Sequence, residues 1–315
     1  MTGQRKHRLM VAGVINVRLA RHCGTFPIPF VPSSHEPGGI SVRLSGTGWT
    51  ITRTLQRLGS DVTMATYVGT DDLGVIAAMG LRRAGLYGPT TLRCDAQPRA
   101  MVLYDGDGRR AGTTDLRATP DLRYPAKTFL DAVDDGPSVA MAVLTNIGFT
   151  RPLVTAMVDR GIPFATDVHL VEWVDNRYNA DWMRAAHVLA CSHESLTGSP
   201  IDWIRAVWQS FGTEIVLVGC GADGALLGVR GTGRIWHVPA TTPRGVRYAS
   251  GAGDTLLGAF AHHYVASGNP VDAARRAVLC AGWKVGGTPD EEPGIPWRRL
   301  AALVAARGLP RAVPL

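Results

Sequence analysis

Few cysteines occur in this sequence, and those that occur lie far apart. The five are Cys23, Cys94, Cys191, Cys220 and Cys280. No two of them form a Cys-x-x-Cys pair, so the sequence supports neither a disulfide framework nor a zinc site. Scattered cysteines are compatible with a reducing compartment, and we expect the protein in the cytoplasm.

The sequence also lacks long runs of one residue class. No block of lysine and arginine is long enough to indicate a nucleic-acid-binding arm, and no apolar run is long enough for a signal peptide or a membrane span. We therefore expect neither nucleic acid nor a membrane as a partner. The net charge of +7 is compatible with small polyanions such as nucleotides, and equally with an arginine-rich surface.

The composition that remains is that of a globular protein with a substantial core, since 45% of the 315 residues are hydrophobic and 19% are charged. Strand patterns alternate with helical patterns along the chain. Strands are predicted at 9–15, 62–67, 139–144, 162–166, 187–190 and 214–218, and helices at 51–58, 152–160, 180–186, 201–211, 271–283 and 297–307. This alternation predicts an α/β fold with a mostly parallel sheet that is covered by helices.

Two segments interrupt the alternation. Residues 39–45 alternate apolar with polar side chains, as a half-exposed strand does. Residues 99–114 contain a short apolar run followed by Asp105-Gly106-Asp107-Gly108, which favours a hairpin turn. Neither pattern suits a sheet that is buried on both faces. We expect these segments to form a small antiparallel lid over a substrate.

The pattern with the clearest chemical meaning lies at residues 250–260. Gly251, Ala252 and Gly253 directly precede an apolar helical pattern, so their N–H groups would surround an anion at the positive end of a helix. Asp254 follows in the first turn. An anion cradle beside a carboxylate fits phosphoryl transfer, because the carboxylate can take a proton from an attacking hydroxyl. A tight turn with an acidic first-turn residue is the alternative without a function.

This stretch, together with the sequence upstream, resembles the PfkB (ribokinase-like) family of small-molecule kinases. The signature of that family is Gly-Ala-Gly-Asp before a helix of small and apolar residues, and residues 251–254 and 258–260 match it. The resemblance implies Asp254 as the catalytic base and the N–H groups of Gly251, Ala252 and Gly253 as the anion hole. The lead-in 248–250 departs from the usual Asp-Thr-Thr, which weakens the case for a monovalent-cation site.

The same resemblance implies an architecture. It predicts one domain over residues 1–315 with three α/β/α layers, and a discontinuous β lid formed by about 18–45 and 98–117. It also implies ATP and Mg²⁺ as cofactors and a homodimer formed through the lid.

On the substrate side, the family has a Gly-Gly-x-Gly-x-Asn element under the substrate, and Ser45 to Thr50 occupy its place. The resemblance implies Asn16, Arg18, Gly46, Gly48 and Thr50 as substrate-binding residues. In sugar-binding members the first strand ends in Asn-x-Asp, whereas this chain has Asn16-Val17-Arg18. An arginine donates hydrogen bonds and cannot accept them. Either Arg18 points elsewhere, or the substrate carries an acceptor such as a carboxylate, phosphate or carbonyl group.

On the nucleotide side, residues 219–224 read Gly-Cys-Gly-Ala-Asp-Gly. This matches the Gly-x-Gly-x-x-Gly fingerprint of nicotinamide-binding proteins, but that fingerprint requires a helix after the glycines, and the sequence there predicts a hairpin. The resemblance implies instead that Gly219, Gly221 and Gly224 bind ATP.

The predicted metal residues are Glu194 and Asp167. The family's Asn-x-x-Glu element would fall at 191–194, where Glu194 is the carboxylate that remains, and Asp167 follows the strand 162–166. Magnesium binds through one or two carboxylates together with phosphates and water.

The predicted function is therefore ATP-dependent phosphorylation of a hydroxyl group on a sugar or sugar derivative, including a sugar acid. A nucleoside kinase is the alternative within the same reaction class. The departures from the family's motifs also leave open a catalytically weak binding or regulatory protein. A nicotinamide-dependent oxidoreductase is disfavoured by the hairpin predicted after Gly224.

Overall fold

The computed structural model describes residues 6–107 and 109–315, and its centre is one large sheet. The strands of this sheet are β1 (Arg8–Ala12), β4 (Asp61–Gly69), β5 (Thr91–Cys94), β8 (Val139–Leu144), β9 (Phe164–Leu170), β10 (Val188–Ser192), β11 (Ile215–Gly219), β12 (Ala225–Val229), β13 (Arg234–Val238) and β14 (Val313–Pro314). Their order is β14-β13-β12-β11-β10-β9-β8-β1-β4-β5. Neighbouring strands are parallel from β5 to β11, and the remaining pairs are antiparallel.

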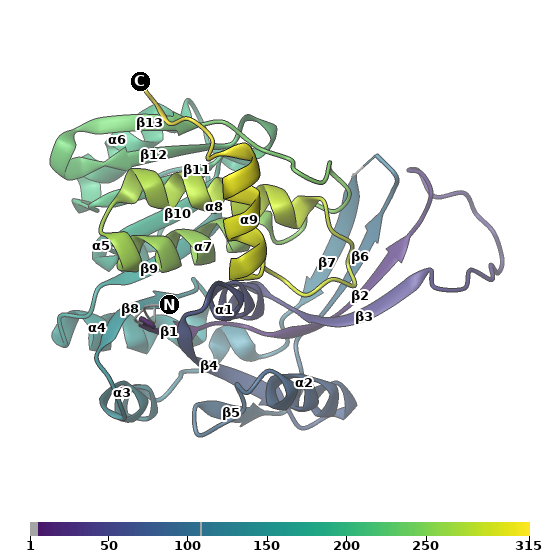
Figure 1. Cartoon of the computed structure of the whole chain (residues 1–315). Helices are drawn as coiled ribbons and strands as arrows, with labels where there is room; N and C mark the ends of the chain where they lie inside the picture. Colours follow the sequence, from purple (N-terminus) through teal and green to yellow (C-terminus); the bar gives the residue numbers. More distant parts are fainter. Residues whose placement is uncertain (1–5, 108) are drawn as a thin grey trace.

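Helices cover both faces of this sheet. They are α1 (Thr47–Leu58), α2 (Asp72–Arg83), α3 (Ala126–Asp134), α4 (Arg151–Asp159), α5 (Ala180–Ala185), α6 (Pro200–Phe211), α7 (Ala252–Ser267), α8 (Pro270–Val285) and α9 (Trp297–Arg307). One buried cluster joins the sheet to α1, α7, α8 and α9, and two others join its opposite face to α3, α4, α5 and α6 (Figure 1). The predicted three-layer α/β/α fold is confirmed.

Helix α7 lies in the middle of its layer, where it packs against both α1 and α8. Every residue from Thr255 to His262 is buried. A helix that is apolar on all sides is stable only inside a protein, so the sequence of α7 requires this central position. The consequence is that α7 is buried from Thr255 onward, while its first turn, which contains the partly buried Asp254, lies where the helix meets the surface.

A second, smaller sheet projects from one side of the central sheet (Figure 1). It consists of β2 (Asn16–His22), β3 (Ile40–Ser45), β6 (Arg99–Tyr104) and β7 (Arg110–Asp115), in the order β3-β2-β6-β7. The expectation of an antiparallel sheet is wrong for one pair, because β2 and β6 are parallel. Both strands leave the central sheet in the same direction, β2 shortly after β1 and β6 shortly after β5. In the predicted turn at 105–108, Gly108 lies outside the described residues.

Among the element boundaries that differ from those predicted, two concern predicted site residues. The strand expected at 9–15 ends at Ala12, and Asn16 opens β2 instead of closing the first strand. The strand expected at 162–166 continues to Leu170, so Asp167 lies within β9. Helices α2 and α3 and strand β5 were not predicted.

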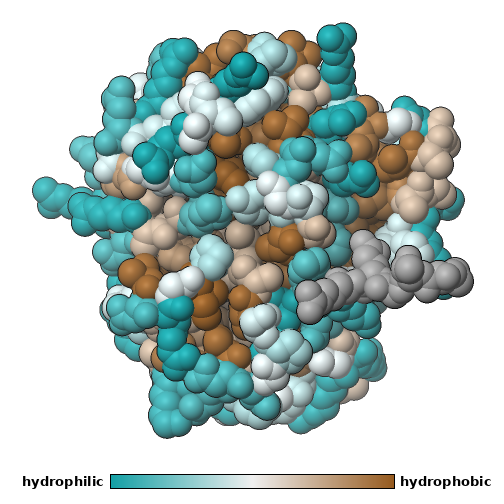
Figure 2. All heavy atoms as spheres, turned by 60° about the vertical axis from the view of Figure 1, so that its left-hand side comes forward, coloured by the Kyte–Doolittle hydropathy of each residue, from teal (hydrophilic) through white to brown (hydrophobic). Residues whose placement is uncertain are grey.

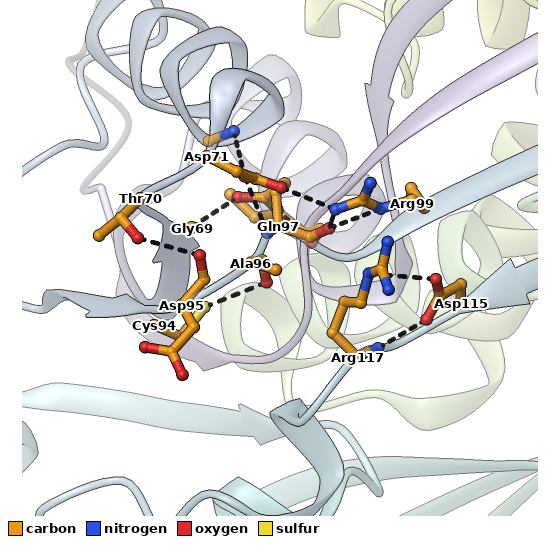
Figure 3. A network of polar contacts seen from close by, with 12 residues as sticks. Gly69, Thr70, Asp71, Cys94, Asp95, Ala96, Gln97, Arg99, Asp115 and Arg117 are labelled. Carbon is orange, nitrogen blue, oxygen red and sulfur yellow. Dashed lines mark hydrogen bonds and ion pairs between the residues drawn. The ribbon is translucent and has the colours of Figure 1, made fainter.

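A polar network fastens the small sheet to the central one (Figure 3). The Asp71 carboxylate accepts hydrogen bonds from the N–H groups of Gly74 and Gln97, both at 3.0 Å, and from Arg99 Nη2 at 2.7 Å. The Gln97 amide accepts from Gly69 N–H at 3.0 Å and donates to the Ile15 carbonyl at 2.9 Å. Asp71 therefore caps α2 and at the same time fixes the start of β6.

Within residues 6–107 and 109–315, no helix has both the length and the apolar character needed to cross a membrane. The face in Figure 2 mixes hydrophilic side chains with separate hydrophobic areas.

We predict that Asp71→Ala lowers the free energy of unfolding by about 2–4 kcal/mol, because it removes a helix cap and charge-assisted hydrogen bonds to two further partners. Urea unfolding followed by circular dichroism measures this change. Asp72→Ala is the matched control, since Asp72 is an exposed carboxylate one residue along the same helix start. Equal losses for the two variants would contradict the role given to Asp71.

Candidate active site

A cavity of about 660 Å³ lies between the small sheet, the start of α1 and the start of α7. The small sheet lines it with Asn16 and Arg18, the α1 region with Gly46 and Thr50, and the α7 region with Gly251 and Asp254. These residues come from three distant parts of the sequence. The structure thus brings the predicted substrate-binding residues to the predicted catalytic ones. Gly48 is not in the lining; it packs beneath the cavity, where its N–H group donates to the Val14 carbonyl at 3.0 Å.

The loop before α7 presents backbone N–H groups. Gly251 has a φ of 80°, a left-handed conformation that turns the chain into the helix and that glycine adopts without strain. Among the described residues, the N–H groups of Gly251 and Gly253 have no hydrogen-bond acceptor, whereas Ala252 N–H donates to the Ala249 carbonyl at 3.2 Å. Two of the three predicted anion-hole donors are therefore available to a ligand at the positive end of α7.

Asp254 lies on the cavity wall in the first turn of α7. Burial raises the pKa of its carboxyl group to about 6; nearby Asp167 raises it further, while His169 and Lys284 oppose the rise. A carboxylate with a pKa near the working pH accepts a proton more effectively than an ordinary one. Perturbed carboxyl groups of this kind are common at catalytic sites.

Asp167, His169 and Asp254 form a cluster in which one ligand atom from each residue lies within 4.8 Å of the others. The backbone N–H of His169 donates to Asp167 Oδ1 at 2.7 Å, and its ring Nδ1 lies 3.5 Å from Asp167 Oδ2. Two carboxylates are the ligand type that Mg²⁺ prefers. Glu194, the other predicted metal residue, is not part of this cluster; it lies in the short turn His193–Ser195 after β10.

Lys284 is a site residue that the sequence analysis missed. Its Nζ, on α8, donates to the Tyr248 carbonyl at 2.9 Å and lies 4.4 Å from the centre of the Tyr248 ring. Burial, followed by the charge of Arg18, lowers the pKa of the Lys284 ammonium group to about 7, while Asp254 opposes this shift. The loop that leads into the predicted anion hole is therefore held by a lysine. The one available signal was a charged residue inside the apolar pattern of this helix.

The glycine-rich turn at 219–224 connects two antiparallel strands. β11 ends at Gly219 and β12 begins at Ala225, so the helix that a nicotinamide fingerprint requires is absent from this part of the described chain. Gly224 has a φ of 98°, and a Cβ atom there would lie 2.1 Å from the Val238 carbonyl oxygen, so the packing of β13 requires glycine. A Cβ atom at Gly219 would lie 3.8 Å from Leu256, which places the turn beside the first turns of α7. A Cβ atom at Gly221 would lie 3.5 Å from the ring of His193.

Sequence comparison matches the C-terminal part of the chain to a known family. The sequence profile of the pfkB family carbohydrate kinases matches residues 181–297. A deoxyribokinase from Salmonella typhi is 42% identical over 100 residues, which make up 30% of this chain and 32% of the relative. The chain thus matches about a third of the length of that curated relative.

Comparison of structures extends the similarity to the whole chain. A microbiome-derived acarbose kinase has a TM-score of 0.84 at 21% identity, covering 95% of this chain and 99% of its own. The ribokinase of Arabidopsis thaliana, solved with ribose and ATP, has a TM-score of 0.75 at 17% identity, covering 95% and 99%. At such identities these structures establish the fold alone. The chain thus has the ribokinase-like fold, and its segment 181–297, which contains both the glycine turn and Asp254, matches the sequence profile of the pfkB family carbohydrate kinases.

Proposed function

We propose that this protein transfers the terminal phosphoryl group of ATP to a hydroxyl group of a sugar or sugar derivative. The observation that carries the proposal is the position of Asp254, which lines one cavity together with Gly251, a residue whose N–H group has no acceptor among the described residues. The names of the relatives, a deoxyribokinase, an acarbose kinase and a ribokinase, support a sugar as the phosphate acceptor.

The residues present fit a nucleotide. ATP would extend from the Gly219–Gly224 turn to the start of α7, because Leu256 connects these two regions. The unpartnered N–H groups of Gly251 and Gly253 would then receive the terminal phosphate. Preorganised amides of this kind stabilise the charge that develops during transfer, which is usually the largest contribution to catalysis. Asp254 would take the proton of the attacking hydroxyl group.

The residues also fit Mg²⁺, which would be held by Asp167 and would neutralise phosphate charge when bound. Glu194 remains the second predicted metal-binding residue. We keep the cytoplasm as the proposed location, which the scattered cysteines support.

We predict that Asp254→Asn lowers kcat by about 10²–10⁴-fold, because the amide cannot accept the hydroxyl proton. Binding of a non-hydrolysable ATP analogue, measured by calorimetry, should change little. Turnover is measured as ADP release with panels of sugars, sugar acids and nucleosides, and the phosphorylated product is identified by mass spectrometry.

The control for this variant is Asp61→Asn, which changes an exposed carboxylate at the start of β4, far along the sequence from the site. Normal turnover in Asp254→Asn would exclude Asp254 as the base. Binding of the ATP analogue without turnover of any panel member would instead favour the catalytically weak binding or regulatory protein.

A second prediction concerns the metal. Asp167→Asn should raise the Mg²⁺ concentration for half-maximal activity on the order of 10-fold, because it removes a carboxylate from the cluster at Asp254. Glu194→Gln, which lies outside that cluster, should have a smaller effect. Titration of the steady-state rate with MgCl₂ measures both, and a larger effect of Glu194→Gln would move the metal site toward the turn after β10.

We further propose that the small sheet is a lid and that two copies of the chain associate through it. The sheet carries the exposed apolar residues Leu19, Val42 and Met101, which lie directly opposite one another on three adjacent strands; Val42 also borders the cavity. Their exposed fractions are 40%, 48% and 54%. A contiguous exposed apolar patch on a sheet commonly marks an interface, and a second copy would bury the same patch from the other side.

Met101→Glu should therefore convert a dimer to a monomer in sedimentation velocity at micromolar protein, because it introduces two charges into the buried interface. Val158→Glu is the control, since Val158 is an equally exposed apolar residue on α4. A wild-type protein that sediments as a monomer would contradict the proposed dimer.

A further inference from the structure

We propose that Arg18 makes this protein specific for an acidic substrate, one that carries a carboxylate or phosphate group apart from the hydroxyl that reacts. The inference rests on the proposed kinase function and adds the chemical class of the substrate. It settles the alternative left open by the sequence, because Arg18 does not point away from the site but lines its cavity.

The guanidinium group of Arg18 is buried and only partly satisfied. The residue is 8% exposed, its Nη2 donates to the Pro289 carbonyl at 2.6 Å, and its Nε has no hydrogen-bond partner among the described residues. The guanidinium carbon lies 5.4 Å from the centre of the Tyr248 ring. A buried charged donor without an acceptor is costly, so the site is incomplete until a ligand supplies one.

The acidic residues close to this region are already paired with other arginines. Asp290 lies 3.6 Å from Arg43, Glu291 lies 2.8 Å from Arg244, and Glu292 lies 3.0 Å from Arg53. None of the ion pairs among the described residues includes Arg18.

Further positive charge surrounds Arg18. Arg43 lies directly opposite it in the β2–β3 register, and Lys284 lies against the same Tyr248 ring. Burial lowers the pKa of Lys284 most, and the charges of Arg18 and of Arg110 on β7 lower it further, while Asp254 and Glu291 oppose them. The small-sheet end of the cavity therefore has a buried cation that lacks a counter-charge from the protein. A carboxylate or phosphate group provides that charge in a geometry that a guanidinium binds well.

Asn16 adds a second contact point for the same substrate. It lies two residues before Arg18 on β2, so both side chains are on the same face of the strand, and both line the cavity. Its Oδ1 is buried and has no hydrogen-bond partner among the described residues. An amide oxygen accepts from a hydroxyl group, and the adjacent guanidinium donates to an anion. Together they fit a polyhydroxylated acid or a sugar phosphate.

The first experiment uses the wild-type protein and two matched sets of substrates. One set is D-ribose, D-ribonate and D-ribose 5-phosphate; the other is D-glucose, D-gluconate and D-glucose 6-phosphate. Within a set the carbon chain is constant, so the carboxylate and phosphate forms distinguish the two sources of the anion. We expect kcat/KM for one charged form to exceed that of the neutral sugar by about 10- to 100-fold. Preference for the neutral sugar in both sets would overturn the inference and leave the kinase function intact.

The second experiment changes the arginine. Arg18→Gln should raise KM for the preferred acid by about 10- to 100-fold with a much smaller change in kcat, because the contact is made in both the ground state and the transition state. Arg18→Lys keeps the positive charge but loses the planar guanidinium that can donate two parallel hydrogen bonds. Its KM should therefore lie between that of the wild-type protein and that of Arg18→Gln. Arg93→Gln, an exposed arginine on β5, is the control. Thermal unfolding identifies any variant that fails to fold. If Arg18→Gln fails to fold, the KM of Arg18→Lys is compared with that of the wild-type protein instead.

A fall in kcat with KM unchanged would place Arg18 on the transferred phosphoryl group and overturn the inference. If no compound of either set is phosphorylated, the kinase proposal fails for these substrates, and calorimetric binding still tests Arg18. Binding of an acid that Arg18→Gln weakens at least 10-fold supports the acidic site, whereas equal binding by both proteins overturns it.

Discussion

The burial of α7 behind its first turn is the constraint on which the site depends. Because α7 is apolar on every side, it can lie only between the sheet, α1 and α8, and this position brings its first turn, with the partly buried Asp254, to the wall of the cavity. Burial raises the pKa of this carboxyl group to about 6, and the preceding loop places Gly251, whose N–H has no acceptor among the described residues, on the same cavity. The proposed base and the proposed anion-binding loop thus both depend on where α7 packs. His169 and Lys284 offset part of the cost of burying a carboxylate.

The second half of the site is the small sheet, and its attachment explains how a separate element can contribute precise contacts. Strands β2 and β6 both follow strands of the central sheet and pair with each other. Hydrogen bonds of Asp71 and Gln97 join the segments that precede these two strands. Rigid anchoring at this point fixes the strand that carries Asn16 and Arg18. The same sheet also carries exposed apolar residues. One element therefore carries both the cavity-lining Asn16 and Arg18 and the exposed apolar residues of the proposed dimer contact.

How much of this could be predicted from the sequence depended on how local each feature is. The pattern of residues 251–260 specified the loop and α7, because small residues before an apolar helical run need no distant partner to be recognised. The parallel pairing of β2 with β6 was not predictable in this way, since it joins segments about eighty residues apart. The proximity of His169 to Asp254 and the contact of Lys284 with the Tyr248 carbonyl likewise arise only when separate elements pack. The sequence did reveal that position 18 is unusual, but only the fold shows that its side chain is buried in the cavity.

Tyr248 connects the two cations of the site, and the difference between arginine and lysine gives them different roles. Lys284 can lose its proton when buried: burial, followed by the charge of Arg18, lowers the pKa of its ammonium group to about 7, and Asp254 opposes this shift. The Arg18 guanidinium is a buried cation, and no ion pair among the described residues includes it. Lys284 has a carboxylate in Asp254 that favours its charged form, but Arg18 has only a carbonyl oxygen and an aromatic ring. Of the two cations, Arg18 is therefore the one whose counter-charge is left to the ligand.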